Sequence, residues 1–172
     1  MPVGADAAET VAAASRGLVE ALRERGWKLA TAESCTGGGV AHAVTAIPGS
    51  SDVFDRGFVT YSNEAKTQML GVPVATIARE GAVSEAVAAA MAEGALRASR
   101  ADVTVAITGI AGPGGGTPAK PVGTVCFAWA TRGVVRDVRT HRLAGDRDEV
   151  RAASVRIALE GLLRLAQGDV LP

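Results

Sequence analysis

Apolar residues recur every three or four positions in several stretches of the chain, which is the pattern of helices with one buried face. The first such stretch runs from Ala5 to Arg25, and Gly26 ends it. Further helices are expected over residues 38–45, 64–70 and 83–99. Gly94 lies inside the last of these, and glycine costs a helix interior about 1 kcal/mol relative to alanine. We therefore expect another backbone to pack closely against Gly94.

The most complete local helix signal lies near the carboxyl end. Asp146 and Glu149 form a capping-box pattern, in which each side chain accepts a hydrogen bond from the other residue's backbone. The helix that follows is expected to bury one face, marked by Val150, Ala153, Ile157, Gly161 and Leu165.

Strands are predicted where β-branched, aromatic or alternating residues are bounded by turn signals, over residues 27–32, 53–61, 102–107, 122–130 and 134–143. Gly57 within the second strand indicates a bulge or a close backbone contact. The Arg132-Gly133 turn joins the last two strands into an antiparallel hairpin. Because helices separate the early strands and a hairpin comes late, the sequence predicts an α/β fold. We expect a three-layer α/β/α sandwich with a mixed five- or six-stranded sheet.

Composition narrows the class of protein. The 172 residues suit one domain over positions 1–172, with about ten flexible residues at the start. Eighteen basic residues balance eighteen acidic ones, and aromatic residues are few, so direct nucleic acid binding is not expected. The two cysteines match no metal-ligand or disulfide spacing, and no segment has the form of a signal peptide or a membrane span. A cytoplasmic location is expected, and the alanine- and glycine-rich helices favour a homodimer or higher homo-oligomer.

The stretch LATAESCTGGGV at residues 29–40 has the best signal for chemistry. A short strand delivers Ser34 into a glycine turn, and a helix follows. This order places a hydroxyl beside backbone N–H groups at the positive end of a helix, which suits an oxyanion or a phosphate. Ser34 is then a nucleophile or a substrate-binding serine. Alternatively, Ser34 and Thr36 only cap the helix. Cys35 is a rival nucleophile, but we expect its side chain to point away from that of Ser34.

A base for Ser34 must come from outside this stretch. His42 lies eight residues further along the predicted helix, over 10 Å from its start, and His141 is expected at the surface of a late strand. Lysine or tyrosine can act as the base where burial shifts the pKa, and Tyr61 and Lys66 bracket a second strand-to-helix junction. Adjacent junctions in an α/β sheet open on one edge, so the three residues can converge there. The alternative is that Lys66 is solvated and Tyr61 only ends a strand.

A glycine-rich segment, TGIAGPGGGT at residues 108–117, follows the clearest buried strand. Its backbone N–H groups could bind phosphate, although it matches neither the P-loop nor the dinucleotide fingerprint. A flexible connection is the alternative. Lys120 and Arg56 are candidate partners for an anion.

Four motifs in order resemble the CinA carboxy-terminal domain family, whose members include nicotinamide-nucleotide amidases. The motifs are AESCTGG at 32–38, GSSDVFDRGFVTYSNEAKTQMLGV at 49–72, GAVSEAVAAAMAEGA at 81–95 and TGIAGPGGGTPAKPVGTV at 108–125, and the resemblance extends from about Leu18 to Leu165. It implies deamidation of nicotinamide mononucleotide (NMN) to nicotinate mononucleotide and ammonia, without a metal or an organic cofactor. Many members carry a further amino-terminal domain linked to pyrophosphatase activity, which is not expected here.

The resemblance also implies roles for individual residues. The family's serine, tyrosine and lysine fall on Ser34, Tyr61 and Lys66, the same three residues that elimination selected. Separately from the resemblance, the residues that we expect to bind the substrate are Thr36, Gly37, Gly38, Asn63, Thr108, Gly109, Gly112, Gly114, Gly115 and Lys120. Hydrolysis of another small amide is an alternative within enzymes. A non-catalytic module that senses a nucleotide or docks a protein is an alternative from another class.

Overall fold

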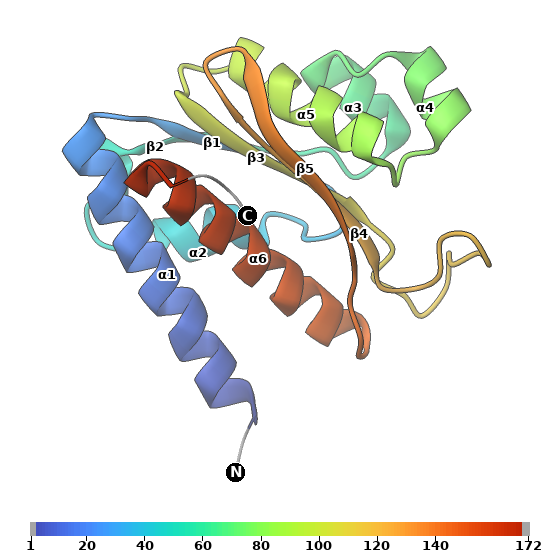
Figure 1. Ribbon diagram of the computed structural model, residues 1–172, viewed down its shortest axis with the longest axis horizontal. Coiled ribbons are helices and arrows are strands. Elements are labelled where there is room, and N and C mark those ends of the chain that lie inside the picture. Colours follow the sequence, from blue (N-terminus) through green and yellow to red (C-terminus); the bar gives the residue numbers. More distant parts are fainter. Residues whose placement is uncertain (1–2, 170–172) are drawn as a thin grey trace.

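A five-stranded mixed sheet forms the middle layer of the molecule (Figure 1). The computed structural model describes residues 3–169, and the side chains of residues 8–169. The strands are β1 (Leu29–Glu33), β2 (Phe54–Val59), β3 (Val103–Gly109), β4 (Thr124–Thr131) and β5 (Val134–Arg142). Their order is β2-β1-β3-β4-β5, with β1 parallel to both neighbours and β4 antiparallel to both of its neighbours. The predicted mixed sheet and the late hairpin are confirmed.

Helices cover both faces of the sheet, which gives the predicted three layers. One face carries α1 (Val3–Arg25), α2 (Gly39–Thr45) and α6 (Arg147–Gln167), and the other carries α3 (Asn63–Leu70), α4 (Val74–Glu80) and α5 (Glu85–Arg97) (Figure 1). The sequence did not predict α4, a helix of only seven residues that leaves Val74 exposed and fully buries none of its side chains. Residues 3–10 of the segment expected to be flexible are helical, and residues 1 and 2 lie outside the described part.

Each layer of helices packs its own core against the sheet. The core beneath α1, α2 and α6 is built from leucine, valine and the stacked rings of Phe127 and Trp129. The core beneath α5 is rich in alanine, because α5 lies close to the sheet. Gly94 permits a similar approach of α3. A Cβ at Gly94 would lie 2.1 Å from the carbonyl oxygen of Leu70, so the predicted close backbone contact is confirmed.

The capping box of α6 is confirmed, with Asp146 accepting from the N–H groups of residues 148 and 149 and Glu149 accepting from the N–H of Asp146. The predicted buried face is partly wrong. Ala153, Ile157 and Leu165 are only half-buried, whereas Ser154, Ala158 and Leu162 are fully buried. The ring of Trp129 fixes this rotation, because it lies where a Cβ at Gly161 would stand.

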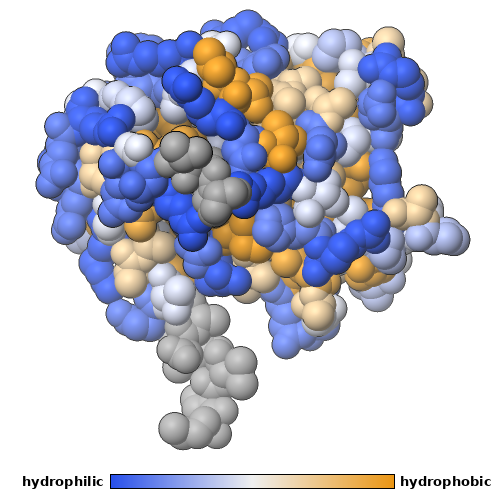
Figure 2. Space-filling model, in the orientation of Figure 1, coloured by the Kyte–Doolittle hydropathy of each residue, from blue (hydrophilic) through white to orange (hydrophobic). Residues whose placement is uncertain are grey.

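The surface mixes hydrophilic side chains with separate apolar patches on the face that Figure 2 shows. Among the described residues, no helix has both the length and the apolar character needed to span a membrane.

Candidate active site

The residues singled out from the sequence meet at the edge of the sheet where the parallel strands end. Ser34 directly follows β1, Tyr61 follows β2 by two residues, and Thr108 lies at the end of β3. A cavity of about 240 Å³ opens there. It is lined by Ser34, Cys35, Tyr61, Asn63, Lys66, Ala82, Val83, Thr108, Gly109, Ala111 and Arg147. The structure therefore brings the predicted triplet into one cavity, as the topology of parallel strands requires.

Lys66 is the largest fully buried side chain of the described residues, with 2% of its surface exposed. Its Nζ lies 3.1 Å from Ser34 Oγ and donates to the carbonyl oxygen of Thr60 at 2.9 Å. Among the residues whose side chains are described, no carboxylate pairs with it. Burial therefore lowers the pKa of Lys66, because an unpaired charge is costly to remove from water. A neutral amine beside a serine hydroxyl can accept the serine's proton.

Cys35 lines the same cavity as Ser34, although we expected its side chain to point away from that of Ser34. The direction of the side chains therefore does not decide which of the two is the nucleophile. Their surroundings do separate them. Cys35 is buried, and burial is the main reason that the pKa of its thiol rises to about 11. A thiol with this pKa stays protonated near neutral pH and is a weak nucleophile. Ser34, by contrast, contacts the buried amine of Lys66 directly.

Tyr61 lies at the mouth of the cavity, with 62% of its surface exposed. Its hydroxyl oxygen accepts a hydrogen bond of 3.0 Å from Arg147, whose other terminal nitrogen donates to the carbonyl oxygen of Gly112 at 2.7 Å. Arg147 thus links the residues after β2 to the glycine-rich segment. The sequence analysis missed Arg147, because it is separated from Tyr61 by 86 positions and its own surroundings look like the first turn of a surface helix.

The carboxylate of Glu33 occupies the amino-terminal end of α2, where we expected N–H groups available to an oxyanion or a phosphate. The carboxylate of Glu33 accepts from the N–H groups of Val40 and Ala41 at 3.0 and 2.9 Å, and from the hydroxyl of Thr36 at 2.7 Å. The prediction that the N–H groups beginning this helix are free is therefore wrong. The alternative, that Ser34 and Thr36 only cap the helix, is wrong as well, because Glu33 holds it.

The predicted substrate-binding residues divide into two groups. Asn63, Thr108 and Gly109 line the cavity, whereas Thr36, Gly37 and Gly38 are not part of its lining. In the glycine-rich segment, Gly112 reaches the site through its carbonyl bond to Arg147, and Gly114 and Gly115 are exposed. Lys120 donates to the carbonyl oxygen of Glu80, and Arg56 to that of Ala98. The substrate-binding roles of these residues stay predictions.

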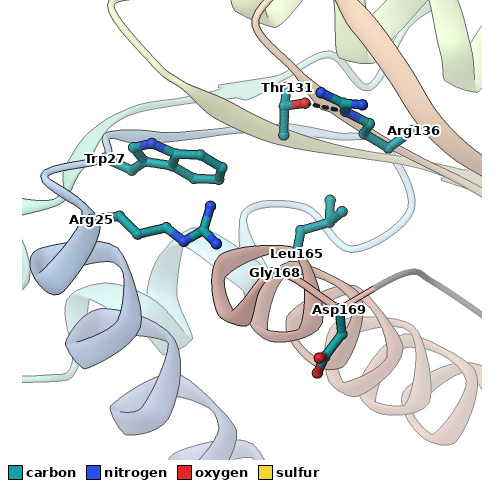
Figure 3. A pocket seen from close by; sticks show the side chains of 7 residues that line it. All are labelled: Arg25, Trp27, Thr131, Arg136, Leu165, Gly168 and Asp169. Carbon is teal, nitrogen blue, oxygen red and sulfur yellow. Dashed lines mark hydrogen bonds between the residues drawn. The ribbon is translucent and has the colours of Figure 1, made fainter.

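A larger cavity, of about 490 Å³, lies between the ends of α1 and α6 (Figure 3). Arg25 stacks on the ring of Trp27 there, at 4.5 Å from its centroid. The lining offers one hydroxyl, that of Thr131, which accepts a hydrogen bond from Arg136. No base stands beside that hydroxyl as Lys66 stands beside Ser34. Of these two cavities, the smaller one is therefore the candidate active site.

Comparison with known proteins finds relatives over most of the chain. Residues 11–166 match a family model described as the CinA C-terminal domain. The nicotinamide-nucleotide amidohydrolase PncC of Escherichia coli strain K12 is 57% identical over 143 residues, which are 83% of this chain and 87% of that protein. A CinA-like protein of Syntrophobacter fumaroxidans is 53% identical over 150 residues, and a putative competence-damage inducible protein of Symbiobacterium thermophilum is 56% identical over 155. This chain spans about a third of those two relatives, 35% and 36% of their length.

A solved structure gives the same fold. The competence/damage inducible protein CihA from Agrobacterium tumefaciens superposes with a TM-score of 0.86 at 49% sequence identity, covering 91% of this chain and 95% of that one.

Proposed function

The chain belongs to the CinA C-terminal domain family, and on that premise we propose that it is an amidohydrolase that converts NMN to nicotinate mononucleotide and ammonia. Several relatives named nicotinamide-nucleotide amidohydrolase PncC are 52–57% identical over most of the chain, which supports this activity. The observation that carries the mechanism is the contact of 3.1 Å between Ser34 Oγ and the buried, unpaired amine of Lys66.

In the proposed mechanism Lys66 is neutral when substrate binds. It takes the hydroxyl proton of Ser34 directly, and the serine oxygen attacks the carboxamide carbon. The tetrahedral intermediate collapses, the C–N bond breaks, and the nitrogen leaves as ammonia with the proton that Lys66 returns. Water then attacks the acyl-enzyme ester, again with Lys66 as base, and releases the carboxylate product and free Ser34. Tyr61 bonds to Arg147 and not to Ser34 or Lys66, which favours direct proton transfer.

The developing oxyanion needs N–H donors that face the cavity. The cavity-lining residues whose backbone N–H donates to no carbonyl of the described residues include Cys35, which directly follows Ser34, and Ala111 in the glycine-rich segment. We assign the oxyanion to these groups in preference to Thr36, Gly37 and Gly38. A donor of this kind typically lowers the barrier by about 2.7–4 kcal/mol.

The 5′-phosphate is assigned to Arg147. Its guanidinium lines the cavity and, among the residues whose side chains are described, bonds only to the neutral oxygens of Tyr61 and Gly112. Its positive charge is therefore available for an anion. The cavity of about 240 Å³ is smaller than the roughly 300–1,000 Å³ of typical ligand sites. It suits the pyridine ring and its carboxamide, with the phosphate at the mouth beside Arg147.

Ammonia release from NMN by the purified protein tests this function, with Ser34→Ala as the decisive variant. We expect Ser34→Ala to keep its fold and lose ammonia release. Near-normal turnover by this variant would exclude the serine mechanism.

A panel of other small amides tests the alternative substrates, and binding of NMN without turnover by the unmodified protein would favour a non-catalytic module. The cytoplasmic location and the homo-oligomeric state stay predictions.

A further inference from the structure

Glu33 precedes the proposed nucleophile and is a buried carboxylate with no cationic partner among the described residues. None of its surface is exposed. Its three hydrogen bonds come from the Thr36 hydroxyl and from the N–H groups of Val40 and Ala41, the second and third residues of α2. All three donors belong to the segment that begins α2, so the carboxylate is held at the amino-terminal end of this helix.

The position of Glu33 is unusual for a residue that binds the start of a helix. The residue that caps a helix normally stands at its boundary, which here is Gly38, and Gly38 has no side chain. The carboxylate instead reaches from the end of β1 across seven residues to α2. It therefore closes a loop that contains Ser34 and fixes the distance between the strand and the helix.

Arg151 of α6 also holds this loop, donating to the carbonyl oxygens of Cys35 and Thr36 at 3.2 and 3.5 Å. Backbone bonds connect the loop to the sheet. The N–H of Ser34 donates to the carbonyl of Ile107 at 2.9 Å, and its carbonyl accepts from Gly37 at 3.0 Å. The carbonyl of Glu33 accepts from the N–H of Thr60 at 2.9 Å, and Thr60 also holds Lys66. The backbone and carboxylate of Glu33 thus connect the segments that carry the nucleophile and the base.

We propose that Glu33 is a positioning residue for Ser34, which rests on the catalytic role proposed above for Ser34. Its carboxylate holds the loop so that Ser34 Oγ stays within hydrogen-bonding distance of Lys66. Glu33 does not touch the substrate.

Two substitutions separate the charge of Glu33 from its reach. Glu33→Gln keeps the length but turns one acceptor oxygen into an NH₂ group that faces backbone N–H donors. Glu33→Asp keeps the charge but shortens the side chain by one methylene group, so the loop must move to keep its bonds. A displacement of about 1 Å in an active site can cost on the order of 100-fold in rate. We expect kcat to fall at least tenfold in both variants, with KM within about threefold of the unmodified value.

The control is Asp102→Asn, which changes another carboxylate that accepts a backbone N–H, that of Lys28, at the opposite end of β3. Assays are run below the unfolding transition of every variant, which circular dichroism locates. We expect Asp102→Asn to lose stability and keep kcat. If Glu33→Gln and Glu33→Asp, both folded, also keep kcat within twofold, Glu33 only stabilises the helix and the positioning role is refuted.

Labelling of Ser34 by a fluorophosphonate, measured by mass spectrometry with Ser34→Ala as the blank, distinguishes this inference from the proposed function. If the unmodified protein reacts with the reagent but releases no ammonia from NMN, the proposed substrate is wrong, and Glu33→Gln should still be labelled at least tenfold more slowly. Equal labelling rates would overturn the role of Glu33.

Discussion

Replacing Gly94 by alanine should destabilise the protein and slow the reaction, although alanine is the better helix former. A Cβ at Gly94 would lie 2.1 Å from the Leu70 carbonyl oxygen and 2.8 Å from the Leu70 carbonyl carbon and Cβ. Ordinary contacts begin near 3.4 Å, so α3 and α5 must separate by about 1 Å. Such overpacking costs typically 1–3 kcal/mol, against a gain of about 1 kcal/mol from helix propensity. The overlap is with backbone atoms, which cannot move aside as a flexible side chain can, so the cost should lie in the upper part of this range, about 2–3 kcal/mol. We therefore expect a net loss of about 1–2 kcal/mol in the free energy of unfolding.

The same displacement should reach the active site. Leu70 ends α3, and Lys66 lies one helical turn before it, so moving the end of α3 shifts the amine relative to Ser34. We expect kcat to fall by on the order of 10- to 100-fold in Gly94→Ala at temperatures where it is fully folded.

Gly17→Ala is the matched control. Gly17 lies within α1, and a Cβ there would meet only Leu163, at 3.6 Å, an ordinary contact. This variant should gain up to about 1 kcal/mol, and a change of 1 kcal/mol shifts the Tm of a domain of this size by about 2–4 °C. Thermal unfolding followed by circular dichroism measures both variants. Equal shifts of the same sign would refute the reasoning from the space around each glycine, as would a Gly94→Ala variant as stable as the unmodified protein.

Three further predictions concern the chemistry of the site. Lys66→Met should lose ammonia release yet be no less stable than the unmodified protein at pH 7. The substitution replaces a buried amine, which is costly to remove from water, by an apolar side chain of similar length; chemical denaturation measures the stability. Because burial lowers the pKa of Lys66 in the folded protein, the folded protein releases the proton of this amine at a lower pH than the unfolded chain, which keeps it up to about pH 10.5. The free energy of unfolding of the unmodified protein should therefore rise with pH between the lowered pKa and 10.5. In a pH–rate profile, kcat/KM should also rise with pH, with the midpoint of the rise below 10.5. A profile without this rise would contradict Lys66 as the base. Cys35→Ala should release ammonia at a rate within about tenfold of the unmodified protein. Iodoacetamide at pH 8 should modify Cys35 in the folded protein only slowly, because a pKa of about 11 leaves on the order of one thiol per thousand as thiolate. Rapid modification, seen by mass spectrometry, would indicate a reactive thiol.

Much of the fold could be predicted from short-range patterns. The capping box at Asp146 and Glu149, the end at residue 70 of the helix predicted over 64–70, and the turn at Arg132 and Gly133 depend on neighbours within a few positions. All three are present in the structure. The order of strands and helices fixed the parallel pairing of β1 with its neighbours, which in turn brings the ends of β1 and β2 together. Ser34, Tyr61 and Lys66 could be grouped for that reason, before any side chain was placed.

Other features depend on which segments meet, and this only the tertiary structure decides. Arg147 reaches Tyr61 because α6 returns to the edge where β2 ends, and a helix that begins with arginine gives no sign of that partner. The direction in which α6 faces follows from the ring of Trp129, and Glu33 binds α2 because the glycine turn folds back on it. Residue types and spacing thus determine the elements and the candidate nucleophile and base. The distance of 3.1 Å between them, and the burial that lowers the pKa of Lys66, arise only when all the layers pack and exclude water.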